Sequence, residues 1–106
     1  QQSNMRKMRF QENTIKDLAT LNRGQSMLLG LYVKGYTHAQ LQLYKYYADL
    51  EVFAHEQKDL DVADMIIRNQ LGDGDTIEYL DLSDTEGPLF ILRWRGNFIE
   101  TEDKQI

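Results

Sequence analysis

Apolar residues in the first third of the chain recur at helical spacing. Ile15, Leu18 and Leu21 follow Thr14, which suits the N-cap of a helix. A dense apolar run occupies 26–33, and periodicity alone leaves a helix and a buried strand both open there. Lys34-Gly35 has the composition of a helix end and favours the helical alternative. We predict a helix over about 14–34.

The stretch 35–41 predicts that a second helix follows at once. Gly35 suits the left-handed position past a helix end, and Thr37 with Gln40 matches a capping box. The apolar residues beyond it recur at steps of four and three: Ala39, Leu43, Tyr46, Leu50 and Phe53. This spacing predicts a helix over about 38–57, which would form a helical hairpin with the first. A shorter third helix is predicted over about 61–71, between Asp61 as N-cap and the stop at Gly72.

The pattern changes to short-period alternation after Gly74. Strands are predicted over about 76–82 and 89–95, with a third short strand over about 98–101. The expected fold class is therefore α+β: an N-terminal helical hairpin and a short third helix, followed by a C-terminal antiparallel β-hairpin or three-stranded meander. Residues 5–106 suit a single domain. Gln1 to Asn4 precede Met5 and have the character of residues left from cloning, so they are set apart from the fold.

Composition points to a cytoplasmic protein without a membrane span. Cysteine is absent, which suits a reducing compartment, and no apolar run reaches the ~18–20 residues that a transmembrane helix needs. The net charge of −5 is unevenly distributed, with +5 over residues 1–48 and −10 over residues 49–106. Such asymmetry indicates a basic partner or complementary faces in an oligomer, or simply solvated surface.

The sequence offers no basis for catalysis. The two histidines, His38 and His55, lie 17 residues apart without a metal-binding spacing, and no serine has the context of a nucleophile. Asp73-Gly74-Asp75 resembles the start of a calcium loop but lacks its later ligands. We therefore expect neither an enzyme nor a metal or other cofactor.

Aromatic and arginine residues make protein–protein association the leading functional hypothesis. Tyrosines cluster around the predicted second helix, and a tryptophan framed by arginines has the composition of an interface hot spot. The candidate interface residues are Tyr36, Tyr44, Tyr47, Arg93, Trp94 and Arg95. We expect a regulatory or interaction module that forms a homodimer through the Tyr-rich helix or binds another protein. A buried role for the tyrosines, under the β-meander, stays open.

The alternative hypothesis is a small DNA-binding regulator. The corner at 35–41 would join the two helices of a helix-turn-helix. Its candidate nucleic-acid contacts are Arg6, Lys7, Arg9, His38, Gln42 and Lys45. The acidic residues further along the predicted second helix weigh against this hypothesis. A weaker third possibility is that the acidic second half mimics nucleic acid or docks on a basic protein.

Overall fold

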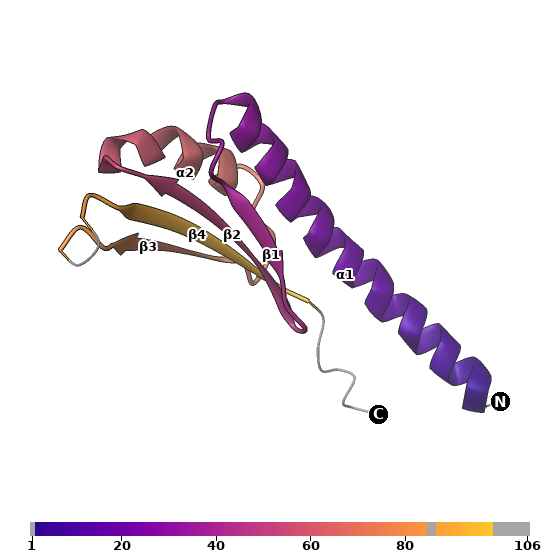
Figure 1. Ribbon diagram of the computed structural model, residues 1–106. Helices are drawn as coiled ribbons and strands as arrows, with labels where there is room; N and C mark the ends of the chain where they lie inside the picture. Colours follow the sequence, from indigo (N-terminus) through magenta and orange to yellow (C-terminus); the bar gives the residue numbers. More distant parts are fainter. Residues whose placement is uncertain (1, 85–86, 99–106) are drawn as a thin grey trace.

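Over the residues that the structure describes, two helices pack on one face of a four-stranded antiparallel sheet (Figure 1). The structure is a computed structural model that describes residues 2–84 and 87–98, with side chains described from Leu18 onward. Within them the elements are α1 (Gln2–Val33), β1 (Gln40–Leu43), β2 (Tyr47–Ala54), the 3-10 turn η1 (Gln57–Leu60), α2 (Asp61–Arg68), β3 (Thr76–Asp81) and β4 (Phe90–Asn97). The strand order is β1-β2-β4-β3, so the α+β class is confirmed.

The predicted N-terminal helical hairpin is wrong. Residues 38–57, predicted as its second helix, form β1, β2 and the turn between them. The same region also shows an alternation of period two. Ala48, Leu50 and Val52 are buried, while the residues between them point to the other side of the sheet. Pairing with β4 along all eight residues of β2 decides between the two patterns, because it satisfies the backbone of both strands.

The corner at Gly35 ends one helix but begins no other. Gly35 has a φ of 101°, and its N–H donates to the carbonyl of Tyr32 at 3.0 Å. The Tyr36 N–H donates to the carbonyl of Leu31 at 3.0 Å, which completes a Schellman motif. The predicted stop is therefore confirmed. The predicted N-cap at Thr37 is wrong, since the chain turns there and enters β1.

The other predicted elements agree more closely with the structure. The region 26–33 is helical, and α1 begins at Gln2 rather than near residue 14. The third predicted helix corresponds to α2, which ends three residues before position 71. The predicted strands over 76–82 and 89–95 correspond to β3 and β4. Of the predicted strand over 98–101, only Phe98 lies within the described residues, and it follows the end of β4.

The core lies between the helices and the sheet and centres on Trp94, which is fully buried. Two glycines make room for its indole ring. A Cβ on Gly24 of α1 would lie 3.1 Å from Cζ3 of Trp94, and a Cβ on Gly96 of β4 would overlap its Cζ2. Trp94 shares one buried cluster with other fully buried side chains from both helices and the sheet: Met27 and Leu31 of α1, Leu50 and Val52 of β2, and Ile67 of α2.

A buried carboxylate ties this core to its surroundings. The Asp75 side chain is 1 % exposed and receives a two-pronged contact from Arg23 of α1, at 3.2 Å from Nε and 2.9 Å from Nη2. The same carboxylate accepts the Trp94 Nε1–H at 3.0 Å and the Gly72 backbone N–H at 2.9 Å. Asp75 thereby joins α1, the α2–β3 connection and β4 through charge-assisted hydrogen bonds.

Replacing Gly96 by Ala should destabilise the fold by about 1–3 kcal/mol, because the new methyl group would overlap the Trp94 ring and approach Cγ2 of Thr20 to 2.8 Å. Urea denaturation followed by fluorescence of the single tryptophan measures this change. Gly30→Ala is the control: its Cβ would meet only Ile66, at 3.3 Å, and helix propensity favours Ala by ~1 kcal/mol. Equal losses in both variants would contradict the proposed packing.

Asp75→Asn should cost ~2–4 kcal/mol, because it removes the charge that compensates Arg23 while keeping the shape of the side chain. The midpoint of urea unfolding reports this cost. Asp73→Asn, two residues away and exposed, should change stability by less than ~0.5 kcal/mol. A loss at Asp75 as small as that at Asp73 would show that the buried carboxylate is dispensable.

Candidate functional site: the uncovered face of the sheet

Within the described residues, both helices lie on one face of the sheet and leave the other face uncovered (Figure 1). Side chains alternate between the two faces along each strand, and the strand pairing aligns those of the uncovered face in rows. One row contains Gln42, Asp49, Arg95 and Thr76, and the next contains Gln40, Glu51, Arg93 and Glu78. We call this surface, from β1 to β3, the open face.

Charged side chains on the middle strands of the open face form direct ion pairs. Arg95 donates to both oxygens of Asp49, at 2.7 Å from Nε and 2.9 Å from Nη2. Arg93 bridges two strands, with Nε 2.9 Å from Glu51 on β2 and Nη1 3.1 Å from Glu78 on β3. These opposite charges are direct cross-strand neighbours, the arrangement that stabilises antiparallel pairs.

The two arginines of the open face keep their charge at any pH the protein meets. The hydrogen bond to Glu51 raises the pKa of Arg93, with further support from the nearby carboxylates. The hydrogen bond to Asp49 is the main cause that raises the pKa of Arg95. Both guanidinium groups therefore stay protonated, and neither can act as a catalytic base.

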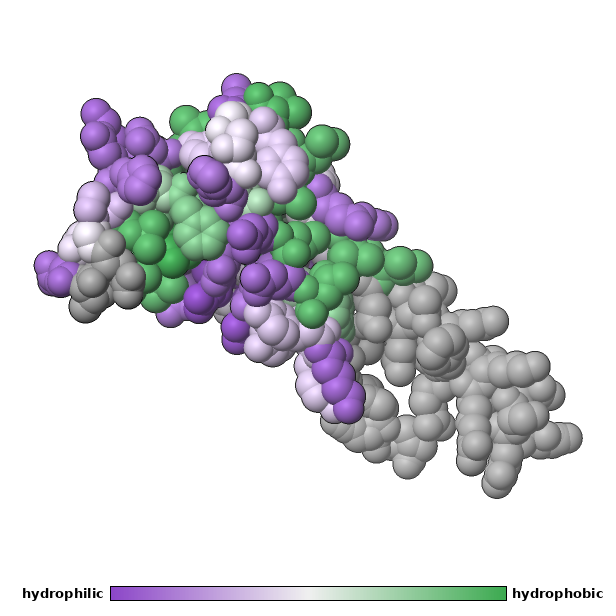
Figure 2. All heavy atoms as spheres, viewed as in Figure 1, coloured by the Kyte–Doolittle hydropathy of each residue, from purple (hydrophilic) through white to green (hydrophobic). Residues whose placement is uncertain are grey.

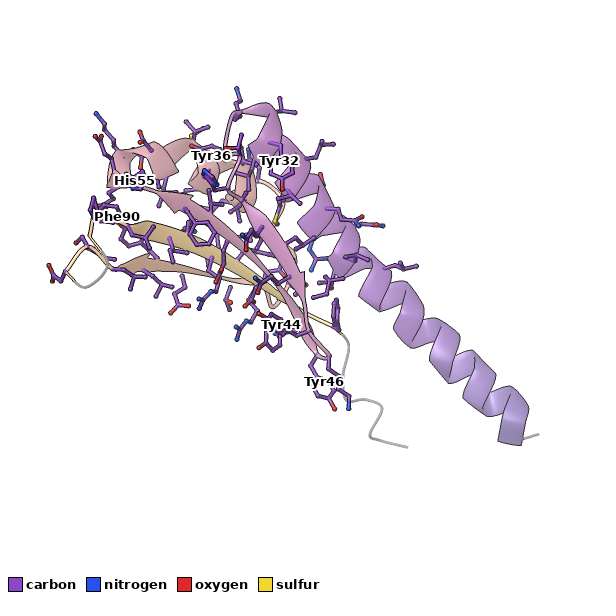
Figure 3. All side chains as sticks on the ribbon, in the orientation of Figure 1. Tyr32, Tyr36, Tyr44, Tyr46, His55 and Phe90 are labelled. Carbon is purple, nitrogen blue, oxygen red and sulfur yellow. The ribbon has the colours of Figure 1, made fainter. Side chains whose placement is uncertain are left out.

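An aromatic group forms one end of the open face. The rings of Tyr44 and Tyr47 lie with centroids 4.8 Å apart, and the Arg95 guanidinium stacks 3.9 Å from the Tyr47 centroid. The Tyr44 hydroxyl donates to the side chain of Gln42. Figure 3 shows Tyr44 beneath the sheet and Tyr46 at the tip of the β1–β2 turn. Because Tyr44 is 45 % exposed, this end offers aromatic area that the described residues leave accessible.

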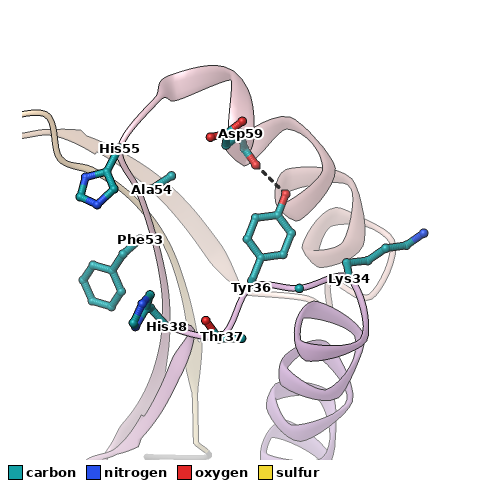
Figure 4. Close-up of a pocket in the computed structure, with 9 residues that line it drawn as sticks. Lys34, Tyr36, Thr37, His38, Phe53, Ala54, His55 and Asp59 are labelled. Carbon is teal, nitrogen blue, oxygen red and sulfur yellow. Dashed lines mark hydrogen bonds between the residues drawn. The ribbon is translucent and has the colours of Figure 1, made fainter.

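A shallow pocket of about 390 Å³ lies at the other end of β2 (Figure 4). It is lined by Lys34, Gly35, Tyr36, Thr37, His38, Phe53, Ala54, His55 and Asp59. His55 Nδ1 lies 2.9 Å from the Pro88 carbonyl oxygen. Among the described residues there is no cluster of three or more histidine, aspartate or glutamate side chains placed to hold a metal ion. The pocket therefore contributes shape and apolar surface to this end of the molecule.

Four of the six candidate interface residues lie together on the open face: Tyr44, Tyr47, Arg93 and Arg95. The other two have structural roles. Trp94 is the buried centre of the core. The Tyr36 hydroxyl accepts the Ala63 N–H at 3.2 Å and donates to the Asp59 carbonyl (Figure 4). Tyr36 thus satisfies a free N–H at the start of α2, where no side chain provides a local cap.

Sequence reasoning missed the acidic partners on the open face: Asp49, Glu51 and Glu78. The signal was present, because residues 47–54 alternate between buried small or aliphatic side chains and larger polar or aromatic ones. A strand over residues 47–54 places Asp49 and Glu51 on the same face of the sheet. There they are cross-strand neighbours of the arginines of β4.

The helix-turn-helix predicted at 35–41 is wrong, because this corner joins α1 to β1 rather than to a second helix. His38 lines the pocket, Gln42 lies on β1, and Lys45 sits in the β1–β2 turn with Nζ 5.3 Å from the Tyr46 ring centroid. Arg6, Lys7 and Arg9 belong to α1, but their side chains lie outside those described. DNA binding stays an untested prediction, but the region predicted as the recognition helix forms strands.

Comparison with models of known protein families, with curated proteins and with solved structures found no match. No helix in the described part of the chain is long and apolar enough to cross a membrane. A functional assignment for this chain therefore depends on the chemistry of its own surfaces.

Arg95→Ala should lower the free energy of unfolding by about 1–3 kcal/mol, because it leaves the Asp49 carboxylate, whose side chain is 7 % exposed, without its charged donor. Urea denaturation measures the loss. Arg68→Ala is the matched control, since its pair with Asp64 on α2 is solvent-exposed and should contribute less than ~0.5 kcal/mol. Similarly small losses of unfolding free energy in both variants would show that the Arg95–Asp49 pair stabilises the fold no more than an exposed surface ion pair does.

Proposed function

We propose that this protein is a non-enzymatic protein–protein interaction module that binds its partner on the open face. One observation carries the proposal: Tyr44, Tyr47, Arg93 and Arg95 lie on the same side of the sheet, and neither helix covers it. Tyrosine and arginine are enriched where protein surfaces meet, since both combine apolar area with polar groups that tolerate partial hydration.

The open face is also organised before any partner arrives. Arg95 is held by two hydrogen bonds to Asp49 and stacks on Tyr47, while Arg93 is held between two glutamates. Side chains already fixed in one conformation lose less entropy on binding. The fixed Tyr47–Arg95 pair beside the more exposed Tyr44 is the arrangement we expect of a binding hot spot.

A protein partner suits this face better than nucleic acid. Its two arginines are matched by Asp49, Glu51 and Glu78, so the central rows carry a net charge of −1 rather than a basic stripe. A phosphate backbone would have to displace these carboxylates. The side chains left to contact a partner are amides, hydroxyls and aromatic rings, which match a protein surface of mixed polarity.

The predicted dimer cannot form through a Tyr-rich helix, because the tyrosines lie on strands and a turn instead. Tyr44 and Tyr46 stand at a turn between strands, and Tyr47 begins β2. The proposed docking surface is therefore the open face of the sheet, to which all four strands contribute side chains. The absence of cysteine supports a cytoplasmic setting for the interaction.

Photo-crosslinking tests the proposal, because it captures whichever protein lies against the open face. A benzophenone amino acid at Thr76, an exposed open-face position opposite Arg95, should form a discrete protein adduct in cells of the native source. The same group at Asn69, exposed at the end of α2, should not. Adding Tyr44→Ala to the Thr76 probe should reduce the adduct at least severalfold, because it removes the exposed aromatic ring.

Two outcomes would refute the proposal. One is an absence of adducts from Thr76 in cells that contain folded protein. The other is an equal pattern of adducts from Thr76 and Asn69, which would show contact without a preferred face. An adduct of twice the chain mass that depends on Tyr44 would identify the partner on this face as a second copy.

A further inference from the structure

The helix α1 has a narrow face that serves its own domain. Thr20, Gly24, Met27 and Leu31, spaced four, three and four residues apart, are its buried positions. Gly24 lies against the indole of Trp94, Met27 and Leu31 belong to the same buried cluster as Trp94, and the Thr20 hydroxyl donates to the Asn97 carbonyl. This spacing places the four residues in one stripe along the helix, and the opposite side faces away from the sheet.

That opposite side carries a second regular stripe, and every described position in it is exposed. Its members are spaced four, three, four and three residues apart: Leu18, Asn22, Gln25, Leu29 and Tyr32. Leu29 is 64 % exposed, although leucine is a residue that helices usually bury. In Figure 2 apolar surface follows the described part of α1. A lone exposed leucine needs no explanation, but Leu18, Leu29 and Tyr32 exposed in one heptad-spaced row, with the polar Asn22 and Gln25 between them, call for one.

The spacing is that of a heptad repeat, and it continues in the sequence towards the N-terminus. With Asn22 at position a, the a positions are Met8, Ile15, Asn22 and Leu29, and the d positions are Gln11, Leu18, Gln25 and Tyr32. The buried residues Thr20 and Met27 then occupy position f, on the far side from the seam. An asparagine at a single a position is the residue that restricts a coiled coil to two strands in one register.

The length of α1 adds an independent argument. Its 32 residues span ~48 Å, whereas the eight residues of β2 or β4 span ~26 Å. Figure 1 shows the N-terminal part of α1 projecting beyond the sheet, and the molecule is 58 Å along its longest axis but only 19 Å along its shortest. Helices in water owe most of their stability to tertiary packing, so a helix that projects beyond its own domain and carries a heptad repeat in its sequence calls for a partner.

We propose that α1 pairs with α1 of a second copy of this chain as a parallel two-stranded coiled coil. A second copy fits because a parallel pairing places each polar layer, Asn22 and Gln25, against its own equivalent. It also places Lys7, at position g, next to position e of the partner helix, which is occupied by Glu12. This interface differs from the open face and leaves that face free on each copy.

Sedimentation equilibrium of the full chain tests this pairing. The wild-type protein should sediment with twice the chain mass at micromolar concentration. Leu29→Glu should weaken association at least about tenfold, which corresponds to ~1.4 kcal/mol, because it places a charge in the seam. Met65→Glu, at a 62 % exposed position on α2, is the matched control and should associate like the wild type. Far-UV circular dichroism and Trp94 fluorescence confirm that each variant is folded.

A second variant separates a heptad seam from general stickiness. Asn22→Ile removes the polar layer, so it should tighten association about tenfold or more and relax the restriction to two strands. A monomeric wild type, a dimer insensitive to Leu29→Glu, or a dimer unchanged by Asn22→Ile would each overturn the proposal. Photo-crosslinking from Thr76 does not depend on these results, so the coiled coil and the docking function of the open face stand or fall separately.

Discussion

The contact on which the rest of this structure depends is the buried Asp75 carboxylate. It holds Arg23 of α1, the indole N–H of Trp94 and the backbone of Gly72 at one point. The carboxylate lies almost fully out of solvent, and its charge is balanced by a partly exposed guanidinium. Removing either partner would leave an uncompensated charge or donor in the core. Asp75 thereby fixes α1 against the sheet in a single rotation about the helix axis.

This rotation determines what the molecule presents to its surroundings. With Arg23 and Gly24 turned to the core, the heptad positions of α1 face outward. Glycines allow the close approach: Cβ atoms at Gly24 and Gly96 would meet the Trp94 ring, and one at Gly72 would lie 2.6 Å from Cζ of Arg23. Both helices lie on the Trp94 side, so the arginines and tyrosines of the opposite side remain available. The packing of the helices around Trp94 thus determines both the fold and the two proposed binding surfaces.

Local chemistry made some of these features predictable. Gly35 has a positive φ, a backbone conformation that is strained for other residues. A glycine at this position therefore predicts the end of the helix from the sequence alone. β3 and β4 show alternation between clear turn residues. The helix predicted over 38–57 is wrong because Ala39, Leu43, Tyr46, Leu50 and Phe53 satisfy a helical spacing. The strand that pairs with Leu50 and Phe53, β4, lies some 40 residues further along the chain, beyond the reach of local pattern.

Four residues of the candidate site could be predicted from their amino-acid type, but their arrangement in space could not. Arg93 and Arg95 alternate along a strand, so they had to share a face, and Trp94 between them had to point to the other side. Grouping all three as an interface therefore conflicted with the strand prediction itself. The burial of Trp94 depends on Gly24 and Asp75, neither of which signals its role in the sequence.

Hydroxyl-radical footprinting tests the central claim, that the open face is the docking surface, most directly. Tyr44 on the open face and Tyr79 on the helix side are similarly exposed, at 45 % and 40 %, so each serves as the reference for the other. Oxidation should be compared between the purified chain and the chain in extract of its native source. Tyr44 should lose reactivity in the extract, because the partner covers it, while Tyr79 should keep its reactivity. Unchanged oxidation of Tyr44, or equal protection of both tyrosines, would contradict it.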